Sequence, residues 1–164
     1  AIPKVRGAFR LSGQLHSFDF SSQFAYSLGG HAYDGAYASL MHNRQVGNNN
    51  WHTDIRNSWK EPGDITEVPR LLSNLETNVN SLSSRFITSS DYLTLSNVKV
   101  GYTLPTRHIE KSGLTDVNIW VSGDNLFLLS SRDGFNPATS ETGATSTYRY
   151  SPLTTLTLGV RVKF

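Results

Sequence analysis

The segment Thr154-Thr-Leu-Thr-Leu-Gly-Val-Arg-Val-Lys-Phe164 alternates strictly between apolar and polar side chains from Thr155 onward. Successive side chains of a β-strand point to opposite faces, so this segment would have one apolar face and one polar, cationic face. The apolar face would consist of Leu156, Leu158, Val160, Val162 and Phe164. An aromatic residue at the end of such a strand fits a membrane–water interface. The segment therefore predicts a strand of an outer-membrane β-barrel.

Four further segments have the period of β-strands. In residues 17–29, one face carries three phenylalanines, a tyrosine and a leucine, and so much apolar surface requires lipid or a deep core. Residues 6–14 form a shorter candidate, joined to it by a tight link at residues 15–17. Residues 117–129 form another. In residues 86–104 the apolar positions change from odd to even near Asn97, which predicts a β-bulge or a change of face.

Strand length and loop length favour a membrane barrel over a soluble sheet. Strands of soluble proteins usually have about 5–6 residues. Several strands here would have about eleven, which at a tilt near 45° span about 25 Å, the height of an outer-membrane apolar band. Short connections, at residues 14–17 and 105–115, alternate with long ones at about 30–85 and 130–151. The sequence thus predicts about five antiparallel transmembrane strands with long extracellular loops.

Composition limits the functions open to the chain. Of its 164 residues only 17% are charged, the net charge is +2, and the basic residues are scattered, which argues against a nucleic-acid partner. Without cysteine the chain has no disulfide or thiolate metal site. The spacing of its five histidines matches no zinc motif. Oxygen ligands in Asp133-Gly-Phe-Asn136 could hold calcium, but the spacing is not that of an EF-hand, and a turn is the better interpretation.

Several motifs stand in a fixed order along the chain. The most specific are Asp91-Tyr-Leu-Thr-Leu-Ser-Asn-Val-Lys-Val-Gly-Tyr-Thr-Leu-Pro105, Val121-Ser-Gly-Asp-Asn-Leu-Phe127, Gly134-Phe-Asn-Pro137 and the terminal Thr157-Leu-Gly-Val-Arg-Val-Lys-Phe164. Upstream, they are preceded by Tyr26-Ser-Leu-Gly-Gly30, Trp59-Lys-Glu-Pro-Gly-Asp-Ile-Thr66 and Val68-Pro-Arg70. Together these motifs resemble the SusC/RagA group of TonB-dependent transporters, and the similarity covers almost the whole chain.

The resemblance implies a barrel of about 22 strands with a plugged lumen. Residues 1–164 would be its C-terminal part, requiring the remaining barrel and lacking the plug and the segment that contacts TonB. Such proteins import oligosaccharides or peptides across the bacterial outer membrane together with a SusD-like surface lipoprotein that acts as a lid. The resemblance implies no cofactor. It also implies that the apolar residues of the last strand form the signal that barrel-assembly machinery recognises.

Candidate ligand or lid contacts are the aromatic residues of the long loops, Trp51, Trp59, Tyr148 and Tyr150. Packing within the loops explains them equally well. Residues 33–42 have near-helical apolar spacing and are expected to pack the first loop down. No acid/base, nucleophile or metal constellation is found, so we expect a protein that is not an enzyme. The alternative is a secreted carbohydrate-binding β-sandwich, which would explain the alternation and the loop aromatics but not the strand lengths.

Overall fold

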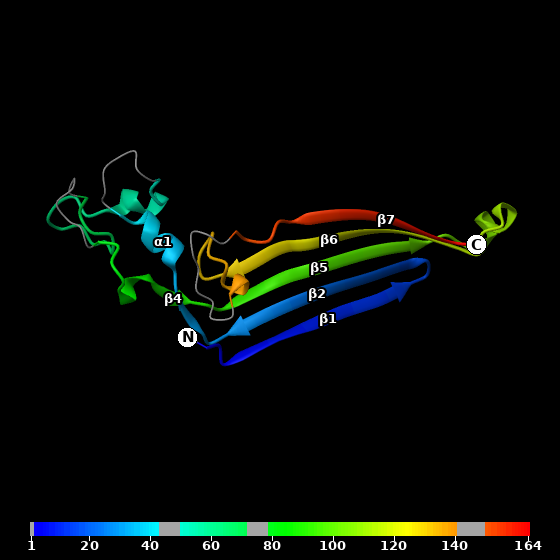
Figure 1. Ribbon diagram of the computed structural model, residues 1–164, viewed down its shortest axis with the longest axis horizontal. Helices are drawn as coiled ribbons and strands as arrows, with labels where there is room; N and C mark the ends of the chain where they lie inside the picture. The colour runs from blue at the N-terminus through cyan, green and yellow to red at the C-terminus, as the bar shows by residue number, and fades with distance from the viewer. Residues whose placement is uncertain (1, 43–49, 72–78, 141–149) are drawn as a thin grey trace.

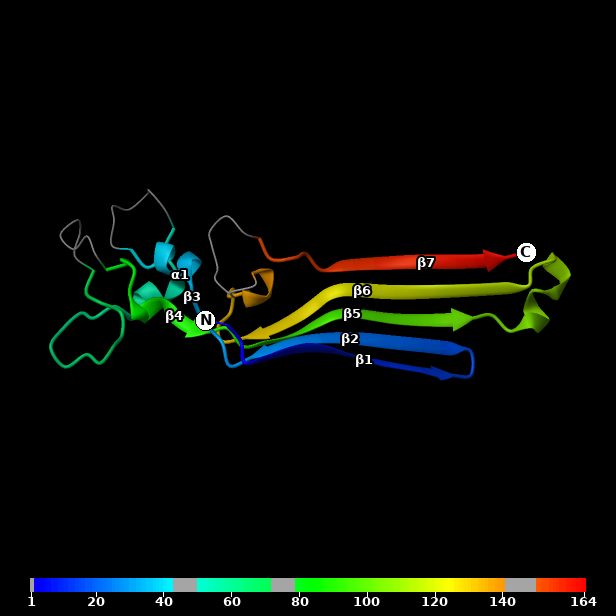
Figure 2. The ribbon, with the colours of Figure 1, turned by 60° about the horizontal axis from the view of Figure 1, so that its bottom comes forward.

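The computed structural model describes residues 2–42, 50–71, 79–140 and 150–164. Five long strands form one antiparallel sheet, in which sequence neighbours are also spatial neighbours (Figures 1 and 2). They are β1 (Val5–Leu15), β2 (Phe18–Leu28), β5 (Tyr92–Thr103), β6 (Asp116–Ser130) and β7 (Thr155–Lys163). The predicted all-β class and the five antiparallel strands are confirmed. Within the described residues, no helix is long and apolar enough to cross a membrane.

The register of the strands aligns all the apolar rows on one face of the sheet. One cross-strand row runs through Leu15, Phe18, Tyr102, Ile119 and Val160, and the next through Gly13, Phe20, Val100, Val121 and Leu158. Cross-strand partners point to the same side, so these rows form a continuous apolar surface. Most of its large side chains are exposed, up to 74% at Leu156. The predicted alternation is therefore confirmed, and no second layer of the described residues covers this face.

The predicted change of phase in β5 is a bulge centred on Ser96. Leu95 pairs with Phe24 whereas Asn97 pairs with Gln23, so Ser96 is the extra residue. The insertion moves the apolar positions from odd to even and keeps Val98 on the apolar face.

The observed bounds of β1, β2 and β6 differ from the predicted ones by one residue at each end. One predicted strand was wrong in extent. The segment 86–104 is two strands, because Oδ1 of Asp91 accepts the backbone N–H groups of Gly29 (2.6 Å) and Gly30 (3.3 Å) and breaks the strand there.

The long connection between β2 and β5 folds into a small unit of its own, which we call the excursion. It contains β3 (His31–Tyr33), α1 (Gly35–Leu40), η1 (Thr53–Asn57), η2 (Ser84–Phe86) and β4 (Ile87–Ser89), with β3 and β4 paired. Its apolar cluster consists of Ala38, Met41, Ile55, Val68 and Phe86. Helix α1 contributes Ala38 and its C-cap residue contributes Met41, which confirms that residues 33–42 pack the loop down.

The connections lie at opposite ends of the sheet according to their length. The excursion and the β6–β7 connection leave from one end, and the β1–β2 turn and the β5–β6 link lie at the other (Figure 1). In that link, η3 (Thr106–His108) and η4 (Glu110–Ser112) end at Gly113, whose φ of 70° is left-handed. Glycine adopts this conformation without steric cost, so Gly113 ends η4.

Candidate functional site: the polar face and the joined connections

The polar face of the sheet carries hydrogen-bonded side chains along its length. Nδ2 of Asn118 donates to Oδ1 of Asp19 (3.3 Å) and to Oγ1 of Thr103 (2.9 Å), which links three adjacent strands. Nearer the other end, Nδ2 of Asn97 donates to Oδ1 of Asp124 at 2.7 Å. These bonds hold the polar side chains in fixed positions, so the face is an ordered polar lining.

Trp120 is a large apolar residue that lies on this polar face. A Cβ at Gly159, its cross-strand partner, would collide with the indole, so the ring lies across the space that this glycine leaves open. On the other side Nζ of Lys99 lies 5.1 Å from the indole centroid, a cation–π distance. Trp120 therefore belongs to the polar lining, and its pairing with a glycine is the signal that sequence reasoning missed.

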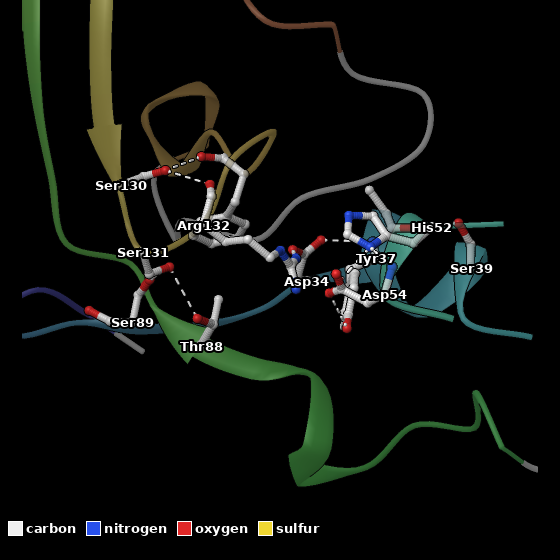
Figure 3. Close-up of polar contacts among 12 residues, drawn as sticks. Asp34, Tyr37, Ser39, His52, Asp54, Thr88, Ser89, Ser130, Ser131 and Arg132 are labelled. Atoms are coloured by element: carbon white, nitrogen blue, oxygen red, sulfur yellow. Dashed lines mark hydrogen bonds and ion pairs between the residues drawn. The ribbon is translucent and has the colours of Figure 1, made fainter. Parts of the chain in front are cut away.

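Arg132 lies just after β6, in the β6–β7 connection, and contacts the excursion. Its guanidinium forms an ion pair with Asp34, whose side chain is 3% exposed, and its Cζ lies 3.6 Å from the centroid of the Tyr37 ring (Figure 3). Burial lowers the pKa of Arg132 from its ordinary value. Because arginine titrates far above neutral pH, it stays charged and pairs with the buried carboxylate.

Two acidic residues of the excursion, Asp34 and Asp54, hold Tyr37 in place. Oδ1 of Asp34 accepts the backbone N–H of Tyr37 (3.0 Å) at the start of α1, and the Tyr37 hydroxyl donates to Oδ2 of Asp54 (2.9 Å). Burial, followed by the hydrogen bond to Asp54, raises the pKa of Tyr37 to about 12. The neutral phenol is thus the form that the site stabilises.

Hydroxyl groups complete the contact between the two connections. Ser131 shares a 3.1 Å hydrogen bond with Thr88 and donates to the carbonyl of Ser89 at 2.9 Å. Oγ of Ser130 lies within hydrogen-bond distance of the carbonyls of Arg132 and Phe135 (Figure 3). We call this set, with Arg132, Asp34 and Tyr37, the arginine joint. It fixes the excursion against the β6–β7 connection at one end of the polar face, and the sequence pattern did not predict it.

The structure does not bring the candidate loop aromatics together through shared contacts. Trp51 donates through Nε1 to Nδ1 of His42 at 3.2 Å, whereas the Trp59 ring lies 5.7 Å from the guanidinium of Arg70. Tyr150 is 92% exposed, and Tyr148 lies outside the described residues. Both tryptophans contact other residues of the excursion, although Trp51 is 36% exposed, so their role as ligand or lid contacts stays a prediction.

The five apolar residues of the last segment lie where the alternation places them. Leu156, Leu158, Val160 and Val162 share the apolar face with Gly123, Val121, Ile119 and Val117 of β6. Phe164 follows the strand and is 88% exposed.

The segment around Asp133 is a turn. Gly134 has a φ of 81°, and Oδ1 of Asn136 accepts the N–H of Ala138 at 3.1 Å, which caps η5 (Pro137–Thr139). This geometry agrees with the turn interpretation. No cluster of three or more metal-ligating side chains occurs among the residues that the structure describes.

We compared the chain with known proteins. No protein-family model matches the chain. Two curated relatives from Formosa agariphila, TonB-dependent receptor P39 and TonB-dependent receptor P3, are 26% and 28% identical over 168 and 172 residues. They match 96% and 99% of this chain, but the chain spans only 16% of each relative.

Solved structures of the RagAB peptide importer have the same fold. The open-open state superimposes with a TM-score of 0.79 at 19% identity, and the closed-closed state with 0.77 at 20% identity. Each match covers 99% of this chain and 17% of the solved chain. These comparisons agree with the resemblance that the motifs indicate. Over almost its whole length the chain is similar to part of two TonB-dependent receptors, and it has the fold of part of the RagAB importer.

Proposed function

We propose that the chain forms part of an importer integral to the bacterial outer membrane, with its apolar face toward lipid and its polar face toward the lumen. The observation that carries the proposal is the continuous apolar surface over five long strands, left uncovered by the described residues. Soluble monomers rarely expose apolar patches above a few hundred Å². A β-sandwich would bury this face against a second sheet, so the secreted carbohydrate-binding module is the weaker alternative.

In this proposal residues 1–164 are the C-terminal part of a plugged barrel of about 22 strands. Outer-membrane barrels have short periplasmic turns and longer extracellular loops. The excursion and the β6–β7 connection would therefore lie outside the cell, and the β1–β2 turn with the β5–β6 link in the periplasm. The plug and the contact with TonB belong to the remaining length of the protein, because the chain spans about a sixth of its curated relatives.

The proposed cargo is an oligosaccharide or a peptide, taken up together with a SusD-like lipoprotein lid. The description of the RagAB structures as a peptide importer supports the peptide class, and the resemblance to the SusC/RagA group supports the lid. The role is transport rather than catalysis, in line with relatives named as receptors. Trp51, Trp59, Tyr148 and Tyr150 remain candidates for contacts with the cargo or the lid.

The test has two arms. Membranes are separated from the aqueous fraction, and the complete protein is expected to require detergent; recovery without detergent would exclude the membrane assignment. A deletion strain is then grown on single glycans and peptides, and loss of growth on one of them is expected. Unchanged uptake of every compound in a broad panel would contradict the transport role.

The apolar row of β7 with Phe164 is also the proposed signal for barrel assembly. Its side chains lie on the outer face, where assembly machinery can reach them before lipid does. Phe164→Ala is expected to lower the amount of assembled barrel in the outer membrane, measured by heat-dependent mobility in gels. The control is Lys163→Ala on the polar face, and equal assembly of both variants would exclude the signal.

A further inference from the structure

A pocket of about 280 Å³ opens on the polar face at the end from which the long connections leave. Its floor is one cross-strand row, in which Arg6 pairs with Ser27 and Ser27 pairs with Tyr92. Its wall is the short η5 segment, from Pro137 to Ser140. The floor comes from three strands of a continuous hydrogen-bonded sheet, so the spacing of these side chains is fixed by the register.

The chemistry of the lining is asymmetric. Arg6 is its single charged residue, and none of the lining residues is acidic. In the described part of the chain, Arg6 makes no ion pair, whereas Arg132 and Arg161 are paired with Asp34 and Asp116. An unpaired guanidinium beside hydroxyl groups is a recognition element for carboxylates, which it binds through two parallel hydrogen bonds.

A second observation points to a ligand at the same place. Ser90 borders the pocket and is only 2% exposed, yet its hydroxyl has no hydrogen-bond partner among the described residues. Buried polar atoms are nearly always satisfied, so an unsatisfied one calls for an explanation. The backbone of Ser90 is held by a 3.0 Å hydrogen bond from its N–H to the carbonyl of Gly30, which fixes the position of this residue at the border of the pocket.

From these observations we infer that the pocket formed by Arg6, Ser27, Ser90 and Tyr92 binds a carboxylate group of the cargo. The inference rests on the proposed import function and specifies the chemistry of one end of the cargo. Arg6 supplies the charge, and the hydroxyl groups supply donors to the carboxylate oxygens. An adjoining pocket of about 630 Å³ shares Tyr92 and Ala138 with the first, and it offers space for the rest of the molecule.

The test measures binding to the complete purified receptor by calorimetry with two matched pairs of probes. One pair is a tripeptide with a free C-terminal carboxylate and its C-terminal amide. The other is a uronic acid-containing disaccharide and its neutral counterpart. We expect one acidic probe to bind about tenfold or more tightly than its neutral partner, as one charge-assisted contact warrants. Which pair shows the difference identifies the source of the carboxylate.

Variants then test whether the tighter binding of the acidic probe depends on the pocket. Arg6→Gln is expected to abolish the preference for the acidic probe. Arg10→Gln is the matched control, since Arg10 lies four residues along the same strand and face but does not line this pocket, and it should keep the preference. Ser90→Ala should weaken binding of the acidic probe several-fold with unchanged thermal stability.

Three outcomes would overturn the inference: no preference in the unmodified receptor, the same preference in Arg6→Gln, or equal losses in Arg6→Gln and Arg10→Gln. Uptake separates this failure from failure of the import function. Deletion of the gene could abolish uptake while the Arg6→Gln variant transports normally and keeps its preference for the acidic probe. That result would support the import function and overturn the carboxylate site. If deletion leaves uptake intact, the import function falls whatever the binding data give.

Discussion

At the residue scale, the arginine joint makes the clearest prediction. Arg132→Gln would leave the buried carboxylate of Asp34 without its cation, which costs about 2–3 kcal/mol of local stability. Limited proteolysis of intact cells should then cleave the excursion faster than in the unmodified protein. Arg161→Gln is the control, because its pair with Asp116 is 3.4 Å long and its side chain is 71% exposed. Equal cleavage rates for both variants would mean that the joint does not hold the excursion.

Tyr37 makes the joint sensitive to alkaline pH. Its pKa is raised from 10.0 to about 12 in the folded chain. A raised pKa contributes stability that is fully present below pH 10 and is lost as the pH rises toward 12. The excursion should therefore open progressively over that interval, as followed by proteolysis rate. Tyr37→Phe keeps the ring beneath Arg132 but has no ionising phenol, so its opening should be less dependent on pH. An unchanged profile in Tyr37→Phe would exclude Tyr37 as the source.

At the scale of the element, the two faces of β7 should respond oppositely to charge. Leu158 lies on the apolar face and Thr157 on the polar face of the same strand. Leu158→Arg should destabilise the assembled barrel by about 2–4 kcal/mol if the residue lies near the middle of the bilayer. Thr157→Arg, one residue away, should have little effect. Urea-induced unfolding of the barrel in lipid vesicles measures both, and equal destabilisation would contradict the assignment of the faces.

The elements also show how far the sequence alone could lead. The alternation in β2, β6 and β7 and the phase change in β5 predicted the strands, their common apolar face and the bulge, because side-chain periodicity is a local property. The filling of the space beside Gly13 by the ring of Phe20 was not predicted, because Phe20 belongs to the neighbouring strand. The break at Asp91 depends on its contact with Gly29, and the arginine joint depends on the ion pair of Arg132 with Asp34. Both contacts join residues more than 60 positions apart, which no local pattern encodes.

At the scale of the whole molecule, the apolar cluster of the excursion and the apolar face of the sheet differ in burial. The cluster around Met41 and Phe86 is buried inside the excursion, whereas the larger apolar face of the sheet is left exposed. A soluble domain would bury its largest apolar surface first. The chain therefore has a small folded unit at one end and a sheet that, under the proposed function, would be stabilised by lipid on one face and by the remaining barrel at its edges.

The long connections lie at one end of the sheet and the short ones at the other, which leads to a prediction about the orientation of the chain in the membrane. The chain has no cysteine, so single cysteines can report on each end once any others in the complete protein are replaced. Ile65 is fully exposed in the excursion, and Ser112 is exposed in the β5–β6 link. A membrane-impermeant maleimide added to intact cells should label Ile65→Cys and leave Ser112→Cys unlabelled. After the outer membrane is opened, both should react, which shows that Ser112→Cys is accessible from the periplasm. Labelling of Ser112→Cys alone in intact cells would reverse the orientation, and labelling of both would contradict a barrel that spans the membrane.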